Sequence, residues 1–469
     1  MSTLGLFYVF SFFRVLYWLG LFQTKEYRID RVFAHLAQES LRSFWYFFPS
    51  FEKLQSNQWK RPRMTLKVCV LFCIWTALHY VFFSIITPHI FLLPIIVFFI
   101  PISLFISLLP LLWIQWSFVE ILLLLARKKI GNTHIIGITG SYGKTSTKQL
   151  LAHVLSKKYS VFTTPHSYNT AFSIAREVIR SFHSQQIAIL EYAAYTTGEI
   201  ARIASYLKPS TVIVTAFAPQ HLGLFGSREA IIHAKRELVL NIKTNGVVYR
   251  NEDSEDTAKI VSGAEHIQTY SANEFPFDWA QNQDGYLDLS YHHHIFHTKI
   301  LGSQYLSQLA VVWKIAQRQQ ITEQEFLKQL ESFRPTQYWP SRKINARGAT
   351  IIDAGRTSNP TGFSASIQLA SFLDTPKKCL VFGGIVDMGN EHKSIHARLG
   401  EEASKIFDEV WYCGEVGREI FTVAYRMQNP SLKLISNSAE IREAFKKADK
   451  STGILIEGFL PKIYESYLQ

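Results

Sequence analysis

The feature that most constrains the fold is a short glycine-containing loop between a strand-like segment and a helix-like segment. Residues 134–139 read HIIGIT, which is typical of a buried β-strand, and GSYGKTST follows directly at 140–147. Apolar side chains then recur at helical spacing at Leu150, Leu151, Val154 and Leu155. This order suits a triphosphate, because loop N–H groups and a helix N-terminus attract phosphate oxygens. We therefore predict an α/β domain with a nucleotide site at this loop.

The residue types within the loop indicate how ATP and Mg²⁺ would be held. Lys144 would reach the β- and γ-phosphates, and the Thr145 hydroxyl would bind Mg²⁺. Ile138 stands where the strict Walker pattern has its first glycine. We expect the cofactor contacts from the loop and the first helical turn, namely Gly140, Ser141, Gly143, Lys144, Thr145 and Ser146.

The N-terminal third of the chain is strongly apolar. Residues 68–126 contain one acid, Glu120, and no Lys or Arg, and a membrane span needs about 20 such residues. We predict spanning helices at 68–86 and 90–109, with a short third span or interfacial helix at 114–126. Residues 4–22 are also apolar, and their positive charges follow the run instead of preceding it. This order favours a retained anchor over a cleaved signal peptide.

Charge and composition support the same location. The net charge is +12, and basic residues flank the apolar region at 60–67 and 127–129, which places both flanks in the cytoplasm. We therefore expect a bacterial inner-membrane protein whose catalytic domains face the cytoplasm and which contacts membrane lipids. The chain shows no recognised nucleic-acid module, so we expect no nucleic-acid partner. Its four cysteines lack zinc-ligand spacing and are read as reduced thiols.

Five segments, in order, resemble motifs of the Mur ligase family. The loop GITGSYGKTST (137–147) is similar to the ATP loop of that family, G-x-T-G-[ST]-x-G-K-[ST]. The other four are similar to the branch that adds D-alanyl-D-alanine to a peptidoglycan precursor: TPHSYNT (164–170), LEYAAYTTGEI (190–200), APQHLGLFGSREAIIHAKRELV (218–239) and VFGGIVDMGNEHKSIHARLG (381–400). The resemblance runs from about residue 137 to the end of the chain.

The resemblance implies a carboxylate–amine ligase. ATP would phosphorylate a substrate carboxylate, and an amine would then displace phosphate. It implies Thr145 and Glu191 as ligands of a first Mg²⁺, Glu191 and His221 as ligands of a second, and Lys235 as the lysine that family members carbamylate. The implied catalytic set is therefore Lys144, Glu191, His221 and Lys235.

The resemblance also implies a domain order. We expect membrane-anchoring α-helical segments at 1–130, a central P-loop ATP-binding α/β domain at 131–337, and a C-terminal Rossmann-like domain at 338–469. Alternating strands and helices support the last of these, with candidate strands at 349–354, 378–383, 410–413, 433–435 and 453–456. In it, SRKINARGATIIDAGRTSNP (341–360) is similar to a family segment that implies Arg342 on the ATP phosphates and Asp353 on the nucleotide or its ribose.

Several positions depart from the family pattern. Tyr305 and Gln308 stand where the family has asparagines, Arg356 where it has tyrosine, and Glu457 where it has the lysine of K-G-S-R. Membrane helices also take the place of the usual uridine-diphosphate-binding domain. We therefore expect acyl and amine substrates that include a lipid-linked, polymeric or membrane-delivered partner, with other cell-wall enzymes nearby.

The function predicted from the sequence is a membrane-anchored, ADP-forming acid–amino-acid ligase of peptidoglycan precursor synthesis. One alternative is a poly-γ-glutamate or capsule-type ligase. Another is a degenerate ATP-binding membrane scaffold, which the retained ATP and metal residues disfavour. A P-loop motor or GTPase is a further alternative, although the chain lacks a base-specificity motif such as N-K-x-D.

Overall fold

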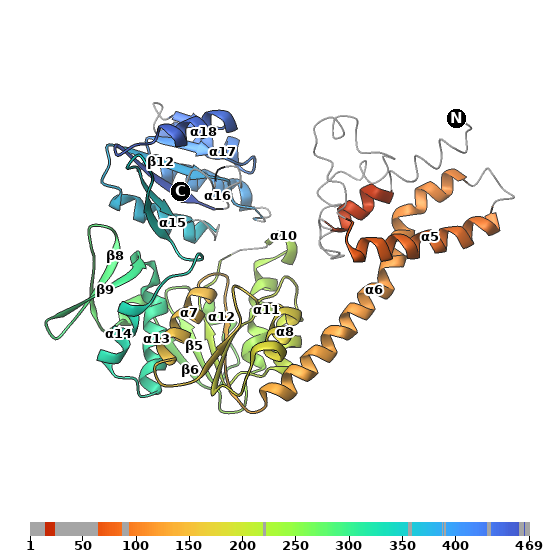
Figure 1. The fold of residues 1–469 in the computed structure, drawn as a ribbon, viewed down its shortest axis with the longest axis horizontal. Helices are drawn as coiled ribbons and strands as arrows, with labels where there is room; N and C mark the ends of the chain where they lie inside the picture. The colour runs from red at the N-terminus through yellow and green to blue at the C-terminus, as the bar shows by residue number, and fades with distance from the viewer. Residues whose placement is uncertain are drawn as a thin grey trace. The chain divides into compact units, whose positions relative to one another are not determined.

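The computed structural model describes residues 15–23, 64–86, 93–218, 222–354, 359–386, 388, 391–428, 433–458 and 464. The chain divides into two compact units, Met1–Ile121 and Leu122–Gln469. Each unit contains a hydrophobic core of its own. Figure 1 shows the described part of the first unit as helices, and the second unit as helices packed around sheets. The predicted metal ligand His221, and Arg356, which departs from the family pattern, lie outside the described residues.

In the first unit, helix α5 (Leu66–Ile86) packs against α6 (Leu93–Ile130), which contributes Leu104 and Leu108 to the shared cluster. The Trp75 indole N–H donates to the Ser103 hydroxyl over 3.0 Å. A helical segment at 15–23 joins the same apolar cluster, whose buried members are Val15, Trp18, Leu19, Phe22, Val68, Leu71, Leu104 and Leu108.

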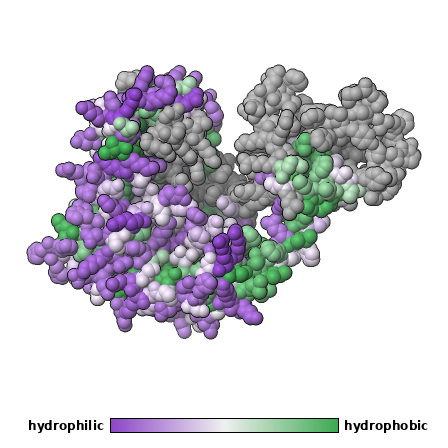
Figure 2. Space-filling view, in the orientation of Figure 1, coloured by the Kyte–Doolittle hydropathy of each residue, from purple (hydrophilic) through white to green (hydrophobic). Residues whose placement is uncertain are grey.

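The predicted break between helices at 90–109 and 114–126 is wrong. A single helix, α6, runs through Pro110, although prolines usually end or kink helices. Within the described residues, only the stretch Ser103–Ile130 is long and apolar enough to cross a membrane. Figure 2 shows apolar surface along the described part of α6, where large side chains are exposed: Trp113, Ile114, Trp116, Phe118 and Ile121.

The second unit is built around a parallel sheet of six strands in the order β2-β3-β1-β4-β5-β6. The central strand β1 is almost wholly buried, as expected for HIIGIT. Because the strands are parallel, the loops after β1, β3 and β4 meet at one edge of the sheet. The strands are β1 (His134–Thr139), β2 (Val161–Thr163), β3 (Ile187–Glu191), β4 (Thr211–Val214), β5 (Val247–Asn251) and β6 (Ile267–Tyr270).

Helices cover both faces of this sheet. On one face α7 (Lys144–Leu155) packs with α13 (Leu306–Arg318) and α14 (Glu323–Ser332), and the predicted apolar positions Leu150, Leu151, Val154 and Leu155 are all buried there. Elsewhere around the sheet lie α8 (Ala171–Ser181), α9 (Glu199–Tyr206), α10 (Leu222–Phe225), α11 (Arg228–Leu240) and α12 (Thr257–Ile260). An antiparallel sheet of β7 (Asp278–Gln281), β8 (Tyr286–Tyr291) and β9 (His294–Leu301) precedes α13.

A second six-stranded sheet, of order β10-β11-β15-β12-β13-β14, forms the C-terminal part. Only β10 runs antiparallel. Five of its strands lie within one residue of the bounds expected from the sequence. The elements are β10 (Ser341–Ile344), β11 (Thr350–Asp353), α15 (Pro360–Leu369), β12 (Lys377–Phe382), α16 (His392–Ser404), β13 (Glu409–Tyr412), α17 (Arg418–Gln428), β14 (Lys433–Ile435), α18 (Ser438–Lys447) and β15 (Thr452–Glu457).

Candidate functional site

The loop after β1 has a backbone that only glycine allows at its first position. Gly140 has a φ of 144° and Gly143 a φ of 81°. A Cβ on Gly140 would lie 2.0 Å from the Thr215 hydroxyl oxygen. That hydroxyl instead donates to the Tyr142 carbonyl over 2.6 Å and so ties the loop to the end of β4. The loop leads into α7, whose N-cap is Gly143.

Lys144 begins α7 and folds over this loop. Its ammonium donates to the carbonyls of Gly140, over 2.6 Å, and of Ser141, over 3.0 Å. Burial lowers the pKa of Lys144, and the carboxylate of Glu191 partly opposes that shift. The Ser146 hydroxyl donates to the Gly143 carbonyl over 3.0 Å, a hydrogen bond between the first turn of α7 and the last residue of the loop.

Thr145 and Glu191, which the resemblance implies as ligands of a first Mg²⁺, lie next to each other. The Thr145 hydroxyl donates to Glu191 Oε2 over 3.1 Å and lies 3.2 Å from the Ser167 hydroxyl. Glu191 is fully buried at the end of β3. Mg²⁺ prefers oxygen ligands and needs only one or two from protein when phosphate and water supply the rest. This oxygen pair fits such an ion, and the described residues hold no cluster of three or more His, Cys, Asp or Glu at which a metal could bind without phosphate.

Lys148 is a site residue that the sequence analysis missed. Its ammonium lies 2.8 Å from Glu191 Oε1, and both side chains are almost fully buried. It also donates to the carbonyls of Thr164 and His166. The sequence did contain a sign of this role, because Lys148 lies at helical spacing with Leu151 and Leu155 and is therefore on the buried face of α7. Lys148 neutralises Glu191 and fixes the segment after β2 beside it.

Lys235 comes from α11 and meets Lys144 at one carbonyl. Its ammonium donates to the Gly140 carbonyl over 3.1 Å, and the side chain is 8% exposed. Burial lowers the pKa of Lys235 well below its usual range, and the Lys144 ammonium lowers it further. The structure thus brings Lys144, Thr145, Glu191 and Lys235 together around the loop.

Arg342 and Asp353 belong to the C-terminal sheet. Arg342 pairs with Asp284 over 3.2 Å and donates to the Phe372 carbonyl. Asp353 ends β11, one strand away from Glu457 at the end of β15. No described contact joins Arg342 to the phosphate loop, so the structure does not bring this residue to the other predicted ATP ligands.

Glu457 has an unusual environment for a carboxylic acid. It is 3% exposed, and neither carboxyl oxygen has a hydrogen bond of normal geometry. Burial raises the pKa of Glu457 to about 8, the Ser366 hydroxyl opposes the rise, and Asp353 adds to it. The sequence showed here only the loss of a positive charge, whereas the fold places a neutral acid inside the domain at neutral pH.

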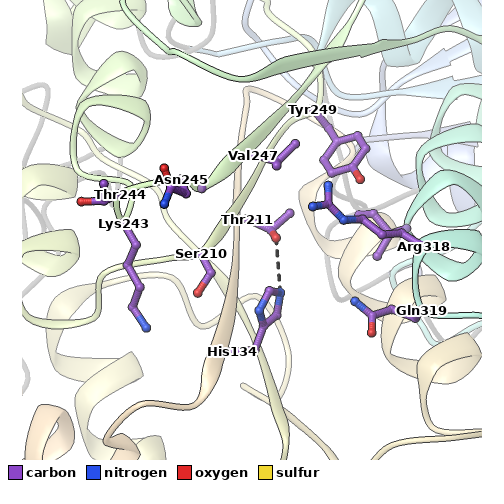
Figure 3. A pocket seen from close by; sticks show the side chains of 12 residues that line it. His134, Ser210, Thr211, Lys243, Thr244, Asn245, Val247, Tyr249, Arg318 and Gln319 are labelled. Carbon is purple, nitrogen blue, oxygen red and sulfur yellow. Dashed lines mark hydrogen bonds between the residues drawn. The ribbon is translucent and has the colours of Figure 1, made fainter.

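A cavity of about 210 Å³ lies at the opposite edge of the central sheet, where β1, β4 and β5 begin. Figure 3 shows Lys243 and Arg318 on either side of His134, which is hydrogen-bonded to Thr211 over 3.2 Å. Burial lowers the pKa of His134, and Lys243 and Arg318 lower it further. Lys243 follows α11 and Arg318 ends α13, where cations stabilise helix C-termini. This cavity is therefore separate from the phosphate loop.

The sequence and fold both have known relatives. Residues 138–312 match the family model of the Mur ligase middle domain. The UDP-N-acetylmuramoyl-tripeptide–D-alanyl-D-alanine ligase of Bacillus subtilis is 27% identical over 295 residues, which cover 61% of this chain and 64% of that protein. The enzyme of the same name from Mycobacterium tuberculosis is 28% identical and is covered over 57% of its length. The chain thus spans less than two thirds of these relatives.

Solved structures agree on the fold. MurF ligase from Thermotoga maritima in complex with ADP superposes with a TM-score of 0.62 at 25% identity, over 73% of this chain and 80% of that one. MurF from Acinetobacter baumannii gives a TM-score of 0.64 at 21% identity, over 74% and 78% of the two chains.

These findings correct the predicted localisation. The inner-membrane location, with catalytic domains facing the cytoplasm, is wrong. The relatives are named for a UDP-linked substrate, which is water-soluble, and not for a membrane function. Within the described residues one helix is long and apolar enough to span a membrane. A single helix of this kind does not establish a membrane location, because the core helix of a soluble protein can be as long and as apolar.

The matched segment contains the loop, the Thr145–Glu191 pair and Lys235, and it carries the six-stranded parallel sheet on which they lie. The chain contains a Mur ligase middle domain and is a homologue of the Mur ligases.

Proposed function

We propose that this chain is an ATP-dependent, ADP-forming ligase that joins a carboxylate to an amine through an acyl phosphate. The observation that carries the proposal is the convergence of Lys144 and Lys235 on the Gly140 carbonyl beside the Thr145–Glu191 pair. The acyl substrate is a UDP-linked muramoyl tripeptide and the amine is D-alanyl-D-alanine, as the names of the relatives state for those proteins.

The reaction has two steps. A carboxylate oxygen of the acyl substrate attacks the γ-phosphorus of ATP, the bond to the β-phosphate oxygen breaks, and ADP leaves. The amine nitrogen then attacks the acyl carbon, inorganic phosphate leaves, the amide forms and one proton is released. Charge builds on phosphate oxygens in the first step, so preorganised cations lower its barrier.

The residues of the loop have separate tasks in this scheme. The Lys144 ammonium moves from the loop carbonyls to the β- and γ-phosphates, for which its charge is better matched than for neutral oxygens. Thr145 and Glu191 hold Mg²⁺, which neutralises phosphate charge when bound. Lys148 remains on Glu191 and prevents an uncompensated buried carboxylate. Asp353 would bind the nucleotide, and His221 would bind a second ion. Arg342 would have to leave its ion pair with Asp284 to reach the ATP phosphates.

Lys235 suits carbamylation by CO₂ because its lowered pKa favours the neutral, nucleophilic amine. The amine nitrogen forms a bond to the CO₂ carbon, a proton is released, and a carbamate anion takes the place of the neutral amine beside Lys144. Removing dissolved CO₂ should then reduce ligation, and bicarbonate should restore it. Equal rates under both conditions would rule out this role.

The proposed domain division is 1–130, 131–337 and 338–469. The central part supplies the nucleotide site and the C-terminal part the amine site. The first 137 residues lie outside the matched family model, so the acyl substrate is the part of the proposal that most needs a direct assay.

Phosphate release from ATP and Mg²⁺ tests the proposal. The UDP-linked muramoyl tripeptide and D-alanyl-D-alanine are added singly and together, with Lys144→Ala as the control. The proposal requires release that depends on both substrates, together with an amide product of the expected mass. Release without any acceptor would indicate a nucleotide hydrolase. ATP binding without release under any condition would favour the scaffold alternative.

A further inference from the structure

The segment TPHSYNT (164–170) lies directly beside the Thr145–Glu191 pair. The Ser167 hydroxyl lies 3.2 Å from the Thr145 hydroxyl. The Lys148 ammonium, which pairs with Glu191, donates to the His166 carbonyl over 2.6 Å. One buried cation therefore holds this segment against the residues proposed to bind Mg²⁺.

His166 has a backbone conformation that side chains rarely adopt. Its φ is +50°, in the left-handed region, where a few per cent of non-glycine residues are found. The Lys148 ammonium holds its carbonyl and the Tyr338 hydroxyl holds its ring, so contacts on both sides maintain the strain. Backbone strain that surrounding contacts maintain is concentrated at ligand sites.

The His166 ring keeps one nitrogen free. Its Nδ1 lies 3.0 Å from the Tyr338 hydroxyl oxygen. A phenol O–H is a good donor to a neutral imidazole nitrogen, so the tautomer with hydrogen on Nε2 is favoured. Nε2 has no partner among the described residues, and the side chain is exposed. The ring therefore offers one N–H to a ligand.

Two aromatic rings lie beside this donor. The Tyr168 ring centroid lies 5.7 Å from that of His166, and the Tyr338 centroid lies 6.1 Å away. Tyr168 is 36% exposed, and nearby in sequence Phe172 is 44% exposed at the start of α8. A hydrogen-bond donor beside aromatic rings suits a ligand that presents an anionic oxygen next to a peptide or sugar face.

We propose that His166 and Tyr338 bind the acyl substrate, with the free imidazole N–H donating to an anionic oxygen of that substrate and the rings covering its peptide or sugar face. This inference rests on the proposed function. The acyl carboxylate must contact the γ-phosphate in the first step. The segment adjoins Thr145, which is proposed to bind the Mg²⁺ of the phosphates. Tyr338 acts as a positioning residue because it orients the imidazole through Nδ1.

Steady-state kinetics with the UDP-linked muramoyl tripeptide as the varied substrate tests the inference. The variants are His166→Ala, His166→Asn and Tyr338→Phe. Asparagine tolerates a positive φ and retains an N–H donor, so it should restore part of what alanine loses. His297→Ala is the matched control, because His297 is also an exposed histidine with its Nδ1 engaged, 3.0 Å from Asp288.

For His166→Ala we expect the KM for the acyl substrate to rise at least about tenfold, as expected for loss of a hydrogen bond to a charged group. The KM for ATP and for the amine should stay unchanged, and kcat should change less than about twofold. Tyr338→Phe should give a smaller rise of the same kind. His297→Ala should match the wild type.

The outcomes separate this inference from the proposed function. If the wild type ligates and His166→Ala has an unchanged KM for the acyl substrate, only the inference fails. A rise confined to the KM for ATP or for the amine also overturns it, because it assigns the segment to another substrate. If the wild type forms no amide with any substrate pair, both are withdrawn.

Discussion

Replacing Glu457 by glutamine should change how stability depends on pH. The carboxyl is 3% exposed, and burial raises its pKa to about 8 from an ordinary value of 4.5. Because the folded-state pKa is raised, the folded protein binds a proton that the unfolded chain releases between these two values. The stabilising contribution is complete below pH 4.5 and is lost as the pH rises through 8. Glutamine is neutral throughout and has no such loss.

The magnitude follows from the same two values. Between pH 6 and pH 8 the wild type releases its proton on unfolding, and each pKa unit is worth about 1.4 kcal/mol. Between pH 6 and pH 9 the wild type should therefore lose about 3 kcal/mol relative to Glu457→Gln. Changes at all other titrating groups cancel in this difference, provided that they are the same in both proteins.

Equilibrium urea unfolding at pH 6 and pH 9, followed by circular dichroism, measures this difference. The transition to compare is the one that unfolds the C-terminal sheet, which contains β15. Glu401→Gln, on the exposed surface of α16, is the control and should follow the wild type at both pH values. Parallel pH profiles for the wild type and Glu457→Gln would refute the reasoning, since they would show that Glu457 is ionised or solvated in the folded protein.

Three further predictions concern the loop and its supports. Lys148→Met should destabilise the protein by about 3–5 kcal/mol in urea unfolding, because it leaves Glu191 buried without a counter-charge. Adding Glu191→Gln should recover part of that loss, and no recovery would argue against the pair. Gly140→Ala should abolish ATP binding in calorimetry while circular dichroism stays native, because its Cβ would lie 2.0 Å from the Thr215 hydroxyl; wild-type affinity would contradict this geometry. Thr322→Ala removes a capping box at the start of α14 and should cost about 1 kcal/mol in urea unfolding, whereas an unchanged midpoint would mean that this cap does not limit stability.

Local patterns determined much of the fold. The β1–loop–α7 unit was predictable because glycine conformation, strand burial and helical spacing act over a few residues. The five parallel strands of the C-terminal sheet were predictable for the same reason, to within one residue. The family motifs also indicated Glu191 and Lys235 as site residues. A family resemblance carries information about contacts between distant segments, which local patterns do not.

The predictions for the apolar N-terminal region were less successful. Hydropathy and flanking charge predicted separate spans and a membrane location. Pro110 does not end α6, and the relatives contradict the location. Composition measures how apolar a segment is, but it does not specify what covers that segment.

Only the tertiary structure decided the contacts that adjust the site. Lys148 meets Glu191 at a separation of 43 residues, and Tyr338 reaches His166 from 172 residues away. Lys235 meets Gly140 at a separation of 95 residues. The sequence by itself determined which side chains could carry this chemistry, because residue types and local spacing fix the loop. Burial, pairing and pKa depend on which distant strands and helices share an edge of the sheet, and that is a property of the folded chain alone.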